Sequence, residues 1–285
     1  MIKRKEKKHI MLRVILIIVS LFVLFILYSI FIGTKGLFVK EYMVSSNIPD
    51  SFDGLKIVHI SDIHYNRTFK EKDLKKLVDR VNLINPDIIV LTGDLLDKKI
   101  EPSDSKGLLT KYLKQMNAKL GKYAISGNHD LKYDYYVDIL KDSDFKDIDN
   151  TYELIYYKDY DPIIIAGLSS CFDDKNIDDK LVEYKKYIAE NDVKYKILLL
   201  HEPDTIDNLS ERFDLILAGH SHNGQVRLPL IGATILPDGA KRYYEEHYTI
   251  NNTELFISSG LGTSSLPLRF MNHPSINFYR INKKS

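Results

Sequence analysis

The apolar positions divide the chain into one unbroken run near the N-terminus and a longer region of short alternating segments. The run covers residues 14–32 and is interrupted only by Ser20, Tyr28 and Ser29. As a helix it would span roughly 28 Å at about 1.5 Å per residue, close to the ~30 Å hydrocarbon core of a bilayer. We therefore predict a transmembrane anchor at residues 14–32, preceded by a basic tip at residues 1–13.

A cleaved signal peptide is the alternative interpretation of this run. Its apolar part would be about 7–15 residues long and would end in a small-x-small cleavage site. The pairs Leu27/Ser29 and Phe31/Gly33 fit such a site poorly. We therefore expect the helix to be retained.

The charges that flank the run predict its orientation. Six basic residues lie within residues 1–13, whereas only Lys35 and Lys40 follow closely. The positive-inside rule then places the N-terminus in the cytoplasm. The protein is expected to cross the cell membrane once, with its domain on the extracytoplasmic side.

Beyond the anchor, strand-like apolar runs alternate with helical patterns. Strands are expected at 55–61, 88–92, 123–126, 163–167, 196–200 and 214–218, and helices at about 71–83, 106–119 and 178–189. This order predicts an α/β domain with buried central strands. The C-terminal third has short strands and no clear helices, which predicts a second, more antiparallel sheet there. We assign residues 33–54 to the membrane exit and a first strand, and residues 55–285 to one globular domain.

Composition and charge exclude several classes of protein. With 285 residues, 44% of them hydrophobic, the chain can bury a large core. The formal charge is +1 and the first thirteen residues carry +5, so the remainder carries −4. No broad nucleic-acid surface is expected, and the basic tip is a topology signal. Cys171 is the single cysteine, which excludes an internal disulfide and a cysteine-based metal site.

The reactive side chains follow the ends of the expected strands, which is where sites form in open α/β sheets. Five strands are followed by carboxylate, imidazole or carboxamide groups: Asp62 and His64; Asp94 and Asp97; Asn128, His129 and Asp130; His201; His220 and His222. A turn or cap would explain any one of these groups, but not all five.

These groups suit divalent metals. Imidazole favours zinc and iron, and carboxylate and amide oxygens extend the range to manganese. Seven plausible ligands without a thiolate exceed what one closed tetrahedral site needs. Two ions that share a carboxylate fit better, about 3.5–4 Å apart, an arrangement that clamps both oxygens of a phosphoryl displacement. We predict two divalent ions, with manganese, iron and zinc all open.

Together the motifs resemble the calcineurin-like metallophosphoesterase superfamily, from about residue 55 to the C-terminus. They read Asp62-x-His64, Gly93-Asp94-x-x-Asp97, Gly127-Asn128-His129-Asp130, His201 and Gly219-His220-x-His222. The resemblance implies a four-layer α/β/β/α sandwich of two mixed sheets, with residues 55–285 as the catalytic domain. The anchor and the stretch "GHSHNGQVRLP" are similar to a bacterial membrane-associated branch related to UDP-2,3-diacylglucosamine pyrophosphatases. Asn223 stands where that branch usually has glycine.

The resemblance also implies a role for each residue. One ion would be held by Asp62, His64, Asp94 and His222, and the other by Asp94, Asn128, His201 and His220, so that Asp94 bridges them. A metal-bridging hydroxide would be the nucleophile. His129 would be the general acid, with Asp97 or Asp130 as its partner. The candidates for substrate contact are Arg67, Gln225, Arg227 and Arg269, since arginine binds phosphate bidentately.

The function expected from these features is that of a membrane-anchored two-metal phosphohydrolase. Its substrates would be phosphodiesters or pyrophosphates, of lipid-linked or nucleotide type. A phosphomonoesterase is one alternative, because the same ligands would serve it. A non-catalytic interaction scaffold is the other, because a fold does not fix a function.

Overall fold

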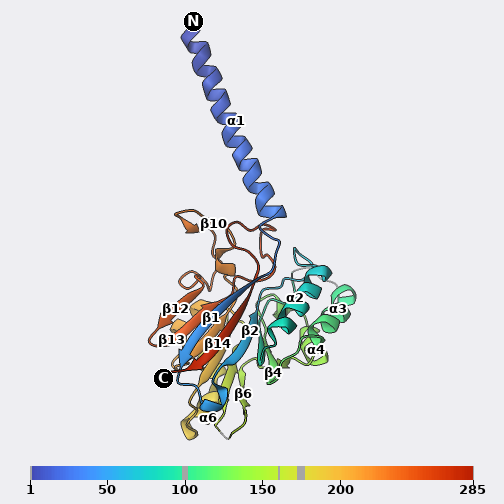
Figure 1. The fold of residues 1–285 in the computed structure, drawn as a ribbon, viewed down its shortest axis with the longest axis vertical. Coiled ribbons are helices and arrows are strands. Elements are labelled where there is room, and N and C mark those ends of the chain that lie inside the picture. The colour runs from blue at the N-terminus through green and yellow to red at the C-terminus, as the bar shows by residue number, and fades with distance from the viewer. Residues whose placement is uncertain (1, 98–101, 160, 172–176, 285) are drawn as a thin grey trace.

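The computed structural model describes residues 2–97, 102–159, 161–171 and 177–284 (Figure 1). Its first sheet has the strand order β1 (Phe38–Ser46), β14 (Ser275–Lys283), β2 (Leu55–Ile60), β3 (Ile88–Thr92), β4 (Gly121–Ile125), β5 (Lys146–Asp147). Its second sheet has the order β12 (His247–Ile250), β13 (Thr253–Ile257), β9 (Leu215–Ala218), β8 (Lys196–Leu200), β7 (Ile163–Gly167), β6 (Thr151–Ile155). A two-stranded hairpin, β10 (Arg227–Leu228) and β11 (Gly232–Ala233), stands apart from both.

The described residues form six α-helices, of which those after α1 cover the outer faces of the sheets. They are α1 (Ile2–Phe31), α2 (Glu71–Ile84), α3 (Pro102–Lys114), α4 (Tyr136–Asp142), α5 (Ile177–Lys180) and α6 (Val182–Glu190), with 3-10 turns η1 (Asp50–Phe52), η2 (Asp130–Lys132), η3 (Pro203–Asn208) and η4 (His222–Gly224). Helices α2, α3 and α4 lie against the first sheet (Figure 1). Helices α5 and α6 pack on the second sheet.

The two-residue period of the strands explains why four layers form. In β3, Ile89 packs toward the helices while Val90 faces the second sheet, because successive side chains point to opposite faces. In β8, Ile197 faces the first sheet and Leu198 faces the outer helices. Strands that are apolar on both faces must be covered on both faces. The four-layer α/β/β/α sandwich of two mixed sheets is thereby confirmed.

The C-terminal strands depart from the expected arrangement. Only β10 and β11 form a separate antiparallel pair among the described residues, whereas β12 and β13 extend the second sheet beside β9 and β14 enters the first sheet. β14 is parallel to β1 and antiparallel to β2. Its Phe278 packs toward the helices and its Tyr279 toward the second sheet, so it is apolar on both faces and suits a central position.

Some element boundaries also differ. We expected the domain to begin at residue 55. β1 lies before that residue and pairs with β14 along its whole length, so it belongs to the first sheet. The expected helix at 106–119 runs instead from Pro102 to Lys114. The expected helix at 178–189 is divided into α5 and α6.

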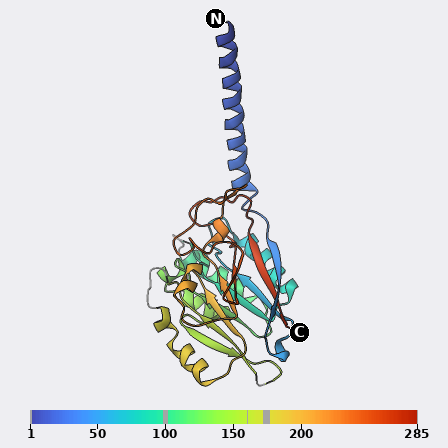
Figure 2. The same ribbon diagram turned by 90° about the vertical axis from the view of Figure 1, so that its left-hand side faces the viewer.

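The N-terminal helix α1 projects from one end of the domain (Figures 1 and 2). Its segment Lys7–Phe31 is long and apolar enough to cross a membrane. Its last turns contact the domain: the rings of Phe25 and Tyr28 lie 4.6 and 5.5 Å from that of Phe270. The Arg269 amide donates to the Ser29 carbonyl at 2.9 Å. The end of α1 is therefore fixed on the loop that precedes β14.

Candidate metal centre

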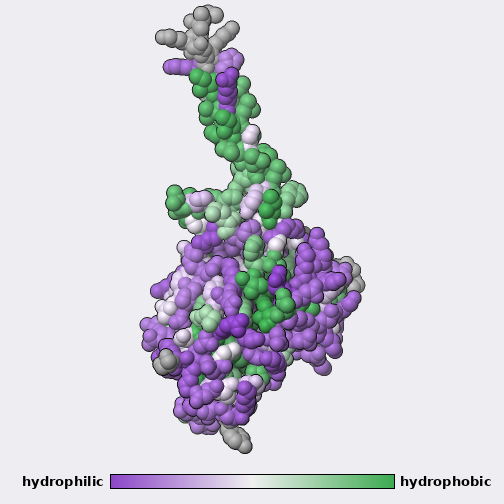
Figure 3. All heavy atoms as spheres, viewed as in Figure 1, coloured by the Kyte–Doolittle hydropathy of each residue, from purple (hydrophilic) through white to green (hydrophobic). Residues whose placement is uncertain are grey.

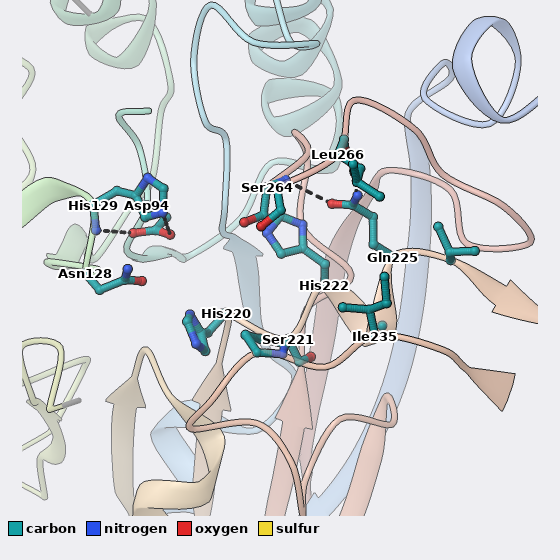
Figure 4. Close-up of a pocket in the computed structure, with 14 residues that line it drawn as sticks. Asp94, Asn128, His129, His220, Ser221, His222, Gln225, Ile235, Ser264 and Leu266 are labelled. Carbon is teal, nitrogen blue, oxygen red and sulfur yellow. Dashed lines mark hydrogen bonds and ion pairs between the residues drawn. The ribbon is translucent and has the colours of Figure 1, made fainter. Parts of the chain in front are cut away.

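The loops after β2, β3, β4, β8 and β9 meet at one edge of the sandwich, so the structure brings all five sequence motifs together. A pocket opens there (Figure 4), lined by Asp94, Asn128, His129, His220, Ser221, His222, Gly224, Gln225, Val226, Ile235, Pro237, Ser264, Ser265 and Leu266. Asp62, His64 and His201 lie buried behind it.

A first group of ligand atoms comes from Asp62, His64 and His222. Nε2 of His222 lies 3.5 Å from Oδ1 of Asp62, and Nε2 of His64 lies 4.0 Å from the same oxygen. The two Nε2 atoms are only 3.2 Å apart. Buried lone pairs at this separation repel one another unless a proton or a cation lies between them, so the three side chains fit a metal ion.

A second group comes from Asp94, His201 and His220. Nε2 of His201 lies 3.5 Å from Oδ2 of Asp94 and 3.3 Å from Oδ1 of Asn128. Oδ2 of Asp94 is also 3.5 Å from Nε2 of His64, a member of the first group. The Asp94 carboxylate therefore lies at the junction of the two groups.

Backbone carbonyls set the tautomers of two ligands in the second group. Nδ1 of His201 lies 2.8 Å from the Thr92 carbonyl, and Nε2 of His220 lies 2.8 Å from the Asp238 carbonyl. A carbonyl only accepts, so each of these nitrogens carries the proton and donates it. The other nitrogen of each ring is then the one that could bind a cation.

The loop backbone is strained at the ligands themselves. Positive φ angles occur at Asp62, His64, Asp94, His220 and His222, between 41° and 64°. Such conformations cost about 1–3 kcal/mol for each non-glycine residue, and they cluster at functional sites. At Gly219 a Cβ atom would lie 2.1 Å from Oγ of Ser61, so only glycine lets these two loops approach.

Burial controls the charge of the site. It raises the pKa of Asp62 to about 6 and lowers the pKa of His64 to about 4. For Asp94, burial opposes ionisation, but the charge and hydrogen bond of His201 outweigh it and hold the pKa of Asp94 well below its ordinary value. Carboxylates embedded among imidazoles with little access to water form a donor set that a divalent cation would complete.

The two acidic neighbours of His129 have different surroundings. Oδ1 of Asp97 lies 3.5 Å from Nδ1 of His129 and 3.8 Å from Nδ1 of His64. The Asp130 carboxylate instead accepts from the backbone amides of Leu95, Leu96 and Gly127, at 2.9–3.3 Å. Asp97 therefore faces the imidazole of His129, whereas Asp130 ties together the loops after β3 and β4.

The three candidate arginines do not line the pocket in the part of the chain that the structure describes. Each of them donates hydrogen bonds to other groups of the protein. Arg269 is fully buried and donates to the carbonyls of Ser259, Gly260 and Gly262. Arg227 donates to both carboxylate oxygens of Glu245, at 2.8 and 2.9 Å. Arg67 donates to Asp97 and to the Ser265 carbonyl. These placements argue against the direct phosphate contacts that we expected.

Gln225 does line the pocket, but its amide holds a loop. Its Nε2 donates to the carbonyls of Leu266 and Leu268, and its Oε1 accepts from the Ser264 amide at 2.9 Å (Figure 4). Asn223 adopts a φ of 47°, a left-handed conformation that asparagine tolerates better than most residues. The departure from glycine at this position is therefore compatible with the local turn.

One wall of the pocket was missed by reasoning from sequence. It consists of Val226, Ile235, Pro237 and Leu266, which come from two loops that carry no metal-ligand motif. The feature of the sequence that could have predicted this wall is the lack of charge, since residues 228–237 and 259–268 contain no Asp, Glu, Lys or Arg. The pocket therefore combines a polar wall with an apolar one.

The chain belongs to the calcineurin-like phosphoesterase family, whose model matches residues 55–224. It is 34% identical over 242 residues to the metallophosphoesterase YkuE of Bacillus subtilis, covering 83% of this chain and 82% of that protein. A metallophosphoesterase of Campylobacter jejuni is 34% identical, covering 91% of this chain and 68% of its own length.

The similarity to a pyrophosphatase of the expected branch is more distant. The UDP-2,3-diacylglucosamine pyrophosphatase LpxG of Chlamydia trachomatis is 28% identical, covering 64% of this chain and 69% of that protein. The comparisons and the site together define a metallophosphoesterase with buried His/Asp clusters that are consistent with a binuclear metal site. A phosphoester substrate follows from the family.

Proposed function

We propose that the protein is a membrane-anchored phosphohydrolase that uses two divalent ions to cleave phosphodiester or pyrophosphate bonds. The observation that carries this proposal is the position of Asp94. Its Oδ2 lies 3.5 Å from His64, in one ligand group, and 3.5 Å from His201, in the other. One carboxylate shared between two sets of donors is what a two-metal site requires.

The ligands divide between the ions as the family resemblance implies. Asp62, His64, Asp94 and His222 would hold one ion, and Asp94, Asn128, His201 and His220 the other. Two such ions, when bound, neutralise phosphate charge and lower the pKa of a water molecule. The strained loops keep the donors in place before substrate arrives, which avoids reorganisation during the reaction.

His129 is the proposed proton donor to the leaving oxygen. It lines the pocket, with Nε2 3.9 Å from Oδ2 of Asp94 and Nδ1 3.5 Å from Oδ1 of Asp97. Asp97 would hold the proton on Nδ1, so that Nε2 can carry and deliver a second proton toward the pocket. Arg67 donates to Oδ2 of Asp97 and so helps to hold this carboxylate beside His129. We assign Arg227 and Arg269 to holding loops and not to binding phosphate.

The anchor is part of the proposal. The contacts of Phe25, Tyr28 and Ser29 with residues 269–270 support a retained helix, because cleavage would remove them from the domain. By the positive-inside rule, the six basic residues of the tip favour a cytoplasmic N-terminus and an extracytoplasmic domain. The apolar wall of the pocket favours a substrate with an apolar part, such as a lipid-linked phosphate or pyrophosphate.

Hydrolysis by the full-length protein in detergent tests this proposal. The protein is stripped of metal with a chelator, refilled separately with manganese, iron or zinc, and assayed on paired chromogenic phosphodiester and phosphomonoester substrates. We expect about two bound ions and metal-dependent diester cleavage. Preferred cleavage of the monoester would favour the phosphomonoesterase alternative. Failure to bind metal would favour the scaffold.

A further inference from the structure

The apolar wall of the pocket continues outward into an exposed surface. We call this surface the apolar rim, and it consists of Leu230, Ile231, Ile235, Leu266 and Met271. Leu230 is fully exposed at the tip of the β10–β11 hairpin, and Ile231 beside it is 72% exposed. Single exposed apolar residues are ordinary, but a cluster at the mouth of a pocket marks a binding surface.

The two segments that carry most of the rim contain no charge. Residues 228–237 and 259–268 lack Asp, Glu, Lys and Arg, in a chain that is 28% charged. Figure 3 shows apolar surface at this level of the molecule, beside the base of α1, while the domain below it is mostly hydrophilic. An uncharged apolar surface avoids the cost of burying ions on contact with an apolar phase.

A short chain of contacts joins the rim to the end of α1. Val226, just before the hairpin, forms a β-bridge with Phe270. Phe270 packs on Phe25 and Tyr28 of α1. Figures 1 and 2 agree that the hairpin and the loops beside it lie at the end of the domain from which α1 projects.

From this arrangement we infer that the apolar rim inserts into the surface of the bilayer that α1 crosses. The inference rests on the membrane anchor of the proposed function. The apolar run at residues 14–32 spans roughly 28 Å at about 1.5 Å per residue, close to the ~30 Å hydrocarbon core. The last turn of α1, and with it the rim, therefore lies at the boundary between acyl chains and headgroups.

Insertion of the rim would place the mouth of the pocket at the membrane surface. Ile235 and Leu266 belong both to the rim and to the lining of the pocket. A phosphate ester carried by a membrane amphiphile could then reach the polar wall while its apolar part stays beside the rim. A substrate dissolved in water would gain nothing from this contact.

Tryptophan fluorescence tests the insertion directly, because the chain contains no tryptophan. Full-length Ile231→Trp is reconstituted into phosphatidylcholine vesicles with and without brominated acyl chains. Leu24→Trp in α1 is the membrane reference, and Val182→Trp on α6, at the opposite end of the domain, is the aqueous reference (Figure 1). We expect bromine to quench Ile231→Trp and Leu24→Trp and to leave Val182→Trp unquenched.

The outcomes of this experiment separate the two proposals. If bromine quenched the fluorescence of Leu24→Trp but not that of Ile231→Trp, the inference that the apolar rim inserts would be overturned and the membrane anchor would stand. A blue-shifted but unquenched Ile231→Trp would also overturn it and would indicate a protein partner, such as a second copy. Absence of quenching in Leu24→Trp would overturn the anchor, and the rim with it.

Activity provides a second measurement that does not depend on fluorescence. The double variant Leu230→Asn/Ile231→Asn changes side chains outside the pocket lining, and Val182→Asn is the matched control. On an acylated phosphodiester embedded in vesicles we expect the double variant to lose about tenfold in rate, because its apolar contact with the membrane is removed. On a water-soluble diester it should match the unsubstituted protein. If the double variant cleaved the vesicle-embedded diester as fast as the unsubstituted protein does, the inference would be contradicted.

Discussion

The two walls of the pocket are built in different ways. The polar wall stands on the ends of buried parallel strands, and its ligands are held by short loops with left-handed backbone. The apolar wall stands on the longer 224–237 and 259–271 segments. Gln225 donates to the Leu266 carbonyl and links the two segments, and Arg269 donates to the Gly262 carbonyl within the second. The candidate metal ligands therefore lie on the rigid scaffold, while the apolar surface lies on loops.

This contrast suggests separate roles for the two walls in the proposed function. The polar wall determines which bond can be broken, because metal donors must be placed accurately. In the proposed function, the apolar wall would bind the apolar part of the substrate through contacts that are not directional. Substitutions in the first wall should act on turnover, and those in the second on substrate preference.

The largest effect is expected at the junction of the ligand groups. Asp94→Asn removes the charge that the two ions of the proposed site would share, and it should reduce kcat by on the order of 1,000-fold or more. Metal content measured on the same sample should fall below that of the unsubstituted protein. Full activity with both ions bound would show that Asp94 is not the bridge.

A second large effect is expected at the proposed proton donor. His129→Gln should reduce kcat by on the order of 100-fold to 1,000-fold while both ions remain bound, since general acid catalysis contributes that much. The loss should be smaller for a diester with a good leaving group, which needs little protonation. An equal loss for good and poor leaving groups would argue against the assigned role.

Comparing Asp97→Asn with Asp130→Asn tests whether these two carboxylates have different roles in the polar wall. Asp97 faces the imidazoles of His64 and His129, so its substitution should lower kcat by about 10- to 100-fold. Asp130 accepts three backbone amides, so its substitution should instead lower the free energy of unfolding by about 1–3 kcal/mol. Thermal unfolding and kcat are measured on both variants. A loss of stability in Asp97→Asn together with a loss of kcat alone in Asp130→Asn would contradict these roles.

The smallest effect is expected on the apolar wall. Leu266→Asn should raise KM for an acylated diester about fivefold, corresponding to a loss of about 1 kcal/mol of apolar contact. The kcat for a small soluble diester should stay unchanged, because the Leu266 side chain carries no metal donor. Val137→Asn, an exposed apolar position on α4, is the control. A fall in kcat on both substrates would show that the two walls are not independent.

Much of the fold follows from local patterns. The apolar strands at 88–92 and 196–200 are found at those positions because their apolar period matches burial on both faces. The destination of β14 did not follow from the sequence, because an apolar strand can fill a gap in either sheet. Pairing between residues more than 200 positions apart is a long-range choice that local pattern does not contain.

The sequence by itself determined the candidate donors, since the motifs from Asp62 to His222 place imidazole, carboxylate and carboxamide groups after five expected strands. Only the tertiary structure decided that Asp97, and not Asp130, faces His129, that three arginines are engaged elsewhere, and that an uncharged wall completes the pocket. The physical reason is that ligand identity is a property of single residues, whereas orientation and burial depend on how distant loops pack.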